Sequence, residues 1–170
     1  MNETPWKTQD PAVYFLAGSL PIEALFHLRQ LSLFLMIRYL DGNIIHAHAK
    51  RVLTNSKDKS WFYGIRNLCV QYDLPHPLIL LDQPPVKSYF KSLCKTKVHD
   101  YWRRKLVFDA QKLQSLRYMD VRFLSLSSPH PIWRSLDGNP YQAEAASVQA
   151  VLLSGRYRTE RLCRFWTSNK

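Results

Sequence analysis

Apolar residues recur at helical spacing through most of the chain, whereas no convincing alternating, strand-like pattern is present. The clearest helical patterns cover residues 19–40, 44–53 and 61–72, a long stretch from 82 to about 116, and 141–166. The last of these is Ala-rich at first and is broken at Ser154 and Gly155. We therefore predict an all-α fold, an irregular bundle of five or six helices joined by Pro-rich extended turns.

Each helical pattern also predicts a core-facing side. Residues 20–40 are strongly apolar but interrupted by charged and polar residues, which favours a buried helix over a membrane span. The apolar positions at helical spacing in that stretch are Ile22, Leu25, Phe26, Leu33, Met36, Ile37 and Leu40. In the longest stretch they are Val86, Phe90, Leu93, Val98, Tyr101, Trp102, Leu106 and Leu113. In the last stretch they are Ala145, Val148, Leu152 and Leu153.

The start of the chain and two proline-rich segments interrupt this helical pattern. Residues 1–18 contain Pro5 and Pro11 and predict an irregular N-terminal segment, followed by a helical accessory domain over 19–170. That domain is expected to be divisible near 117–140. Two rigid, extended turns are predicted, at 74–77 and 128–131, because proline fixes its own φ and restricts the preceding residue. Good helix caps are predicted at Ser19, Asn43, Ser60 and Asp82.

The amino-acid composition narrows the classes of binding partner to consider. The net charge is +11 with a pI near 9.8, so nucleic acid is the first partner to consider, an anionic membrane surface the second and an acidic protein the third. A purely solubilising charge is the alternative. An apolar fraction of 46% with five Trp argues against a disordered chain.

Two basic stretches carry most of the predicted contact with phosphates. The first lies on the long helix and comprises Lys87, Lys91, Lys95, Lys97, Arg103, Arg104 and Lys105, predicted to share the face opposite its apolar residues. The second comprises Arg156, Tyr157, Arg158, Arg161 and Arg164. Arginine beside aromatic residues suits phosphate binding and base stacking, with Tyr157, Trp166 or Trp102 as stacking candidates. A solvated helix surface is the competing interpretation of both stretches.

No catalytic or metal-binding constellation is apparent. The acidic residues are scattered, and neither a Gly-rich phosphate loop nor a nucleophile elbow occurs. His46 and His48 point in different directions on a helix, so we expect no metal there. His76 and His130 lie beside prolines in stiff turns, where hydrogen bonding to turn carbonyls is favoured over a general-base role. Three widely spaced cysteines without a Cys-x-x-Cys predict reduced, intracellular thiols.

Several stretches together resemble the region downstream of the polymerase in the proteins of non-LTR (LINE-type) retrotransposons. They are Leu20-Pro21-Ile22-Glu23-Ala24 with 28–34, Ser60-Trp61-Phe62 leading to 72–77, Tyr101-Trp102, 127–133, and 153–160 with Cys163-Arg164. Their order and spacing, more than any single motif, carry the resemblance, which covers most of the chain from about residue 12.

In that family, the corresponding segment joins the reverse transcriptase and thumb to a small Cys/His zinc knuckle. The resemblance implies a noncatalytic helical accessory region that grips template RNA or target DNA. Polymerase motifs are absent from this sequence, and it ends at Asn169-Lys170, about where the knuckle would begin. We therefore expect a fragment of such a protein, without enzyme activity of its own and without a cofactor.

The leading hypothesis from sequence is an intracellular, nonspecific RNA- or DNA-binding segment, not secreted and not associated with a membrane. The alternative is a structural or protein-interaction module, or a relic without function, whose apolar helices pack on the polymerase domain of a parent protein. Apolar exposure distinguishes the two, because an interaction module leaves an apolar helix face uncovered.

Overall fold

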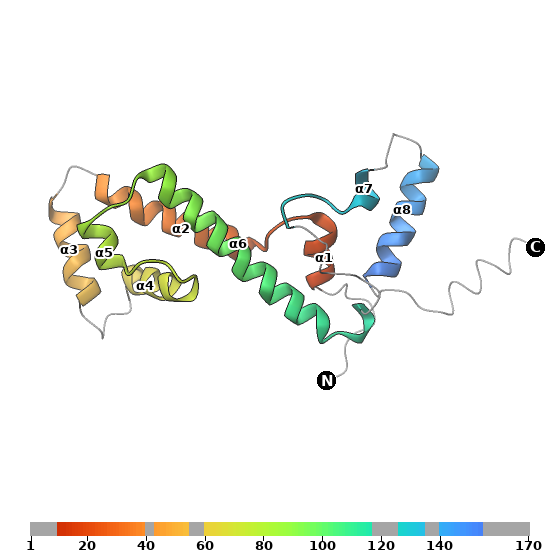
Figure 1. The fold of residues 1–170 in the computed structure, drawn as a ribbon, viewed down its shortest axis with the longest axis horizontal. Coiled ribbons are helices and arrows are strands. Elements are labelled where there is room, and N and C mark those ends of the chain that lie inside the picture. Colours follow the sequence, from red (N-terminus) through yellow and green to blue (C-terminus); the bar gives the residue numbers. More distant parts are fainter. Residues whose placement is uncertain (1–9, 40–42, 55–59, 117–125, 135–139, 155–170) are drawn as a thin grey trace, which may run out of the picture. The chain divides into compact units, whose positions relative to one another are not determined.

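The described part of the chain is helical throughout. The computed structural model describes residues 10–39, 43–54, 60–116, 126–134 and 140–154. Its helices are α1 (Asp10–Ala17), α2 (Ile22–Tyr39), α3 (Asn43–Thr54), α4 (Trp61–Gln71), α5 (Pro77–Asp82), α6 (Lys87–Gln111), the 3-10 helix η1 (Gln114–Leu116), α7 (Pro131–Arg134) and α8 (Pro140–Leu153) (Figure 1). These residues contain no strand, so the predicted all-α class is confirmed.

The chain divides into two compact units. Residues 21–102 form what we call the central unit, and residues 1–20 together with 103–170 form the terminal unit. Helix α6 contributes its first four turns to the central unit and its last residues to the terminal unit. The division predicted near 117–140 falls mostly on residues outside the described part and stays a prediction.

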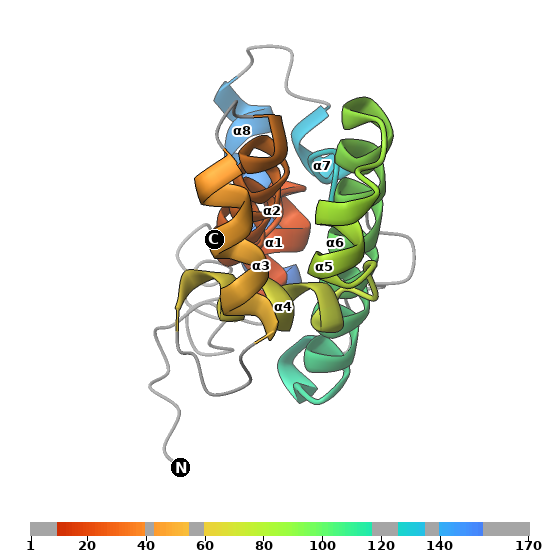
Figure 2. The same ribbon diagram turned by 90° about the vertical axis from the view of Figure 1, so that its left-hand side faces the viewer.

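In the central unit, α3, α4 and α5 pack against one another, and all three contact α2 (Figures 1 and 2). The core draws on α2, α3, α4, α5 and α6. Its buried residues include Ala24, Leu31, Phe34, Leu35, Ala49, Leu53, Ile65, Leu68, Cys69, Tyr72, Leu80, Leu81, Phe90, Cys94, Val98 and Trp102. Lys50 of α3 pairs with Asp82 at the end of α5, and His46 Nε2 donates to the Leu81 carbonyl over 3.2 Å.

Helix α2 forms as predicted, but it is not buried all round. Its core face consists of Ala24, Leu31, Phe34 and Leu35, with His27 and Leu28 half-buried. The residues at predicted apolar positions are instead mostly exposed: Ile22, Leu25, Phe26, Leu33 and Met36. Apolar residues occupy both sides of this helix, so periodicity alone did not distinguish the side that meets the core.

The terminal unit has its own apolar core. It is formed by Ala12, Phe15, Leu16, Leu106, Ala110, Leu116 and Leu126, with Ile132, Ala150 and Leu153 packed at its edge. Trp133 Nε1 donates to the Leu16 carbonyl over 3.0 Å and so fixes α7 to the end of α1. Gly18 has φ +62°, and a Cβ there would lie 2.0 Å from the Ser128 carbonyl oxygen, so no larger residue fits without movement.

Three short helices were not predicted. Residues 10–17 of the expected irregular N-terminal segment form α1 with Pro11 in its first turn, where a missing N–H costs nothing. Each predicted extended turn also leads directly into a helix, α5 after residue 76 and α7 after residue 130. The long stretch is split accordingly, because Asp82 ends α5 and does not cap α6.

Two further details differ from the predicted helix ends and faces. Ser19 does not cap α2, since α2 begins at Ile22 and the N–H groups of Ala24 and Leu25 donate to the carbonyl of Pro21, the residue just before it. In α8, Ala146 is buried, whereas the predicted core residues Ala145 and Val148 are exposed. Among the described helices none is by itself long and apolar enough to cross a membrane; Pro11–Ala17 and Ile22–Ile37 meet that test only as a pair.

Candidate functional site

Three lysines follow one another at four-residue intervals on α6. Lys87, Lys91 and Lys95, which we call the lysine stripe, are all exposed. An α-helix turns by about 100° per residue, so successive members are offset by about 40° and lie within one arc of about 80°. None of the three forms an ion pair within the part of the chain that the structure describes. Their positive charges are therefore exposed to solvent and available to a negatively charged partner.

The other predicted basic residues of α6 do not all share this face. Lys97 lies about 120° around the helix from the middle of the stripe, and its Nζ is 2.7 Å from Asp73 Oδ2. Arg103 and Arg104 lie about 120° and 140° from the middle of the stripe, whereas Lys105, five full turns after Lys87, returns to its side of the helix. All three are exposed and belong to the terminal unit. The seven basic residues therefore do not form the single face predicted from the sequence.

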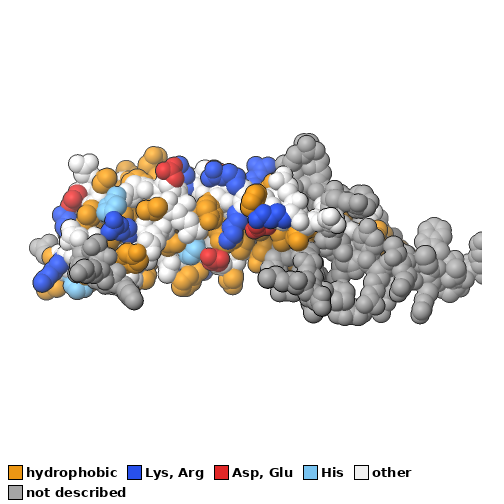
Figure 3. Space-filling model, turned by 90° about the horizontal axis from the view of Figure 1, so that it is seen from below, with side chains coloured by type: hydrophobic (Ala, Val, Ile, Leu, Met, Phe, Trp, Pro, Cys, Tyr) orange, Lys and Arg blue, Asp and Glu red, His pale blue; other side chains and the backbone are white. Residues whose placement is uncertain are grey.

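The space-filling view in Figure 3 also shows dispersed positive charge. On the face drawn in Figure 3, Lys and Arg side chains form separate groups with hydrophobic side chains between them. The second predicted cluster, Arg156, Tyr157, Arg158, Arg161 and Arg164, lies outside the described residues. Within the central unit, the lysine stripe is thus the candidate contact for phosphates.

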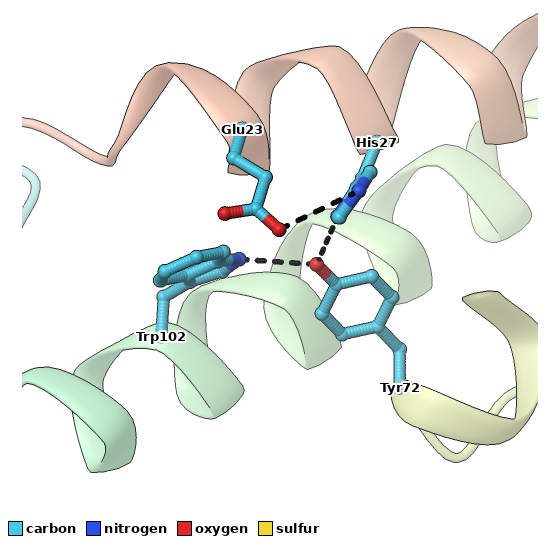
Figure 4. Close-up of polar contacts among 4 residues, drawn as sticks. All are labelled: Glu23, His27, Tyr72 and Trp102. Carbon is cyan, nitrogen blue, oxygen red and sulfur yellow. Dashed lines mark hydrogen bonds and ion pairs between the residues drawn. The ribbon is translucent and has the colours of Figure 1, made fainter. Parts of the chain in front are cut away.

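Trp102 is not a base-stacking residue. It is buried in the core, and its indole Nε1 donates to the Tyr72 hydroxyl over 3.0 Å. The same hydroxyl lies 2.6 Å from His27 Nδ1, and His27 Nε2 lies 4.0 Å from Glu23 Oε1 (Figure 4). Tyr72 at the end of α4 therefore connects α2 with α6, a link that was not predicted.

The order of donors in this polar cluster depends on the tautomer of His27. An indole N–H only donates, so the Tyr72 oxygen accepts from Trp102. With His27 protonated on Nε2, the Tyr72 hydroxyl donates to His27 Nδ1 and the Nε2 proton lies on the side of the Glu23 carboxylate. A carboxylate, an imidazole and a hydroxyl thus follow one another, as they do in nucleophilic catalytic triads.

The burial of Tyr72 argues against catalysis by this cluster. Tyr72 is only 2% exposed, and burial raises the pKa of its hydroxyl to about 12, with a smaller opposing effect from the Trp102 hydrogen bond. A nucleophile needs a lowered pKa or an accessible oxygen, and Tyr72 has neither. The cluster satisfies buried polar groups between three helices, which is a structural role.

The two histidines beside prolines serve as helix caps. His76 Nδ1 accepts the Leu78 N–H over 3.3 Å, and His130 Nδ1 accepts the Ile132 N–H over 3.2 Å. The prediction that these histidines satisfy turn carbonyls is wrong, because each Nδ1 instead accepts from an N–H group of the following helix. Burial lowers the pKa of His130, which favours the neutral ring that this cap requires.

Cysteines and metal ligands offer no reactive site in the described residues. Cys69 and Cys94 are free and buried, and burial raises the pKa of each thiol to about 12. Such thiols are inert, because the thiolate is the reactive form. His48 packs edge-on against Phe62, and no group of three or more His, Cys, Asp or Glu gathers at one point among the residues described.

An apolar cavity of about 420 Å³ lies in the terminal unit. It is lined by Val13, Leu16, Ala17, Trp133, Ala150, Val151 and Ser154. Among the described residues of the lining, Ser154 alone bears a hydroxyl, and its Oγ donates to the Val151 carbonyl over 3.0 Å. This described part of the lining supplies no ionisable side chain for acid–base chemistry.

Comparison with models of protein families, with curated proteins and with solved structures finds no match to this chain. The resemblance to retrotransposon proteins therefore stays a prediction. The residues themselves point to two exposed surfaces of the central unit, the lysine stripe on α6 and the apolar side of α2. The second agrees with the alternative prediction that apolar helices pack on another protein, but its residues were assigned to the core.

Proposed function

We propose that this chain is a noncatalytic helical module that binds the phosphates of RNA or DNA. The observation that carries the proposal is the lysine stripe, three exposed lysines on one side of α6 without an ion pair among the described residues. The net charge of +11 supports it, since a basic protein attracts a polyanion at long range. The role proposed is that of an accessory segment in a retrotransposon protein, as the sequence resemblance implies.

The length of the stripe suits several phosphate contacts. From Lys87 to Lys95 the helix rises by about 12 Å, and a strand of duplex DNA presents a phosphate roughly every 3.4 Å along its axis. Up to three contacts are therefore geometrically reasonable. Lysine reads charge and not base identity, so we propose binding with little sequence preference.

A triple variant tests this proposal. Lys87, Lys91 and Lys95 are changed together to Gln, and binding to single-stranded RNA and duplex DNA is measured by fluorescence anisotropy across a salt series. We expect weaker binding and a flatter salt dependence, by up to about one unit of slope per lost contact.

The control removes the same charge from lysines already engaged in ion pairs. Lys50, Lys97 and Lys112 pair with Asp82, Asp73 and Asp109, and all three are changed to Gln. If both triple variants lose the same affinity, general charge and not the lysine stripe governs binding, and the proposed site is wrong.

Protein binding is a second candidate function. It is favoured by one observation, the exposed apolar side of α2, which does not depend on nucleic-acid binding.

A further inference from the structure

Helix α2 exposes an apolar stripe along about four turns, interrupted at its midpoint by Arg29. Ile22, Leu25, Phe26, Leu33 and Met36, which we call the outer stripe, are between 47% and 82% exposed. At about 100° per residue, all five fall within an arc of about 100°, opposite the face that meets the core. An apolar surface of this length on a folded unit is typical of a binding site.

The outer stripe follows a heptad pattern. Ile22 and Met36 are two heptads apart, Arg29 lies midway between them at the equivalent position, and Leu25, Phe26 and Leu33 flank that line. This spacing is the one used by helices that pair along a shared seam. The geometry of the stripe thus fits another helix lying along α2.

Arg29 determines which helix fits. It is exposed, sits at the midpoint of the stripe, and forms no ion pair within the described residues. A second copy of this chain is disfavoured, because symmetric pairing, parallel or antiparallel, places Arg29 opposite Arg29 of the other copy. A carboxylate on the partner would instead pair with the guanidinium in two parallel hydrogen bonds.

We propose that the outer stripe of α2 binds an amphipathic helix of a partner protein that carries Asp or Glu at the centre of its apolar face. The apolar residues of the stripe supply the buried contact area. Arg29 selects the partner and fixes its register, because an apolar or basic residue opposite it would leave the guanidinium covered and unpaired.

Selection from a displayed library of amphipathic helices tests the proposal. The library has Leu, Ile, Phe or Met along the apolar seam and every amino acid at its central position, and it is selected against the full chain. We expect Asp and Glu to be enriched at that position over Lys and Arg by at least about tenfold. Selection against Arg29→Glu should reverse the preference, and both preferences should be lost with Leu25→Ala/Leu33→Ala.

These variants change exposed residues, and helicity by circular dichroism verifies that each is folded. Failure to enrich any helix on the folded chain would overturn the proposal, as would enrichment without an acidic preference. Dimerisation that is lost in Leu33→Glu would identify a second copy as the occupant and overturn it. Binding to phosphatidylcholine vesicles that is lost in the same variant would identify a lipid surface and overturn it as well.

Discussion

Helices α2 and α6 both bury one side in the core of the central unit, but the sides that they expose differ in chemistry. The outer stripe of α2 is apolar around a single arginine, whereas α6 exposes the lysine stripe. Inside, the two helices share one polar link, because the Tyr72 hydroxyl contacts His27 of α2 and Trp102 of α6. The comparison indicates that packing in the core determines which residues form the inner faces. The exposed residues of the two helices suit two different partners.

The sharpest test of the two sides of α2 uses the same substitution on each. Leu31→Ala removes a fully buried side chain and should lower the free energy of unfolding by about 2–5 kcal/mol. Leu33→Ala, two residues away and 53% exposed, should change it by no more than about 0.5 kcal/mol. Urea denaturation of both variants measures the difference. Similar losses would mean that Leu33 is also part of a core.

Removal of one oxygen atom, that of the Tyr72 hydroxyl, breaks the polar link between α2 and α6. Tyr72→Phe removes the hydroxyl and leaves the buried Trp102 N–H without this acceptor, at an expected cost of about 1–3 kcal/mol. Tyr101→Phe is the matched control, since Tyr101 is half-buried, packs edge-on against Tyr72 at 5.1 Å, and should lose much less. Equal melting temperatures of the two variants would contradict a structural role for the Tyr72 hydroxyl.

A smaller effect is expected at alkaline pH. Burial raises the pKa of Tyr72 from 10.0 to about 12, so between these values the folded chain holds a proton that the unfolded chain has lost. Stability should therefore fall as pH rises above about 10. Cys69 and Cys94, raised from 9.0 to about 12, begin the same decline at lower pH. Melting curves from pH 8 to 11 measure it, and Tyr72→Phe should show a shallower decline above pH 10.

Local features of the fold were predictable, whereas contacts between distant residues were not. The bounds of α4, Trp61–Gln71, and the end of α8 at Leu153 follow from periodicity and from the Ser154-Gly155 pair. Ser60 lies at the predicted N-cap position of α4, but its side chain makes no capping hydrogen bond. The helices after His76 and His130 were missed because proline ends one element and can equally begin the next. The ion pair of Lys97 with Asp73 could not be predicted, because Asp73 lies 24 positions away and no local pattern connects the two.

The inner and outer faces of α2 likewise could not be told apart from the sequence. Ala24 and Leu31 are no more apolar than Leu25 and Leu33, so the sequence does not tell which pair meets the core. The choice depends on the partners that α4 and α5 present. Tyr72 likewise could not be predicted as a link, because it joins residues 45 and 30 positions away.

Lysine modification in the presence and absence of RNA tests phosphate binding by the lysine stripe most directly. The chain is treated with an amine-reactive ester, and the extent of modification at each lysine is measured by mass spectrometry. We expect RNA to protect Lys87, Lys91 and Lys95, while the modification of Lys50 and Lys97 changes little. Equal protection of all five, or no protection of the lysine stripe under conditions where RNA is bound, would contradict it.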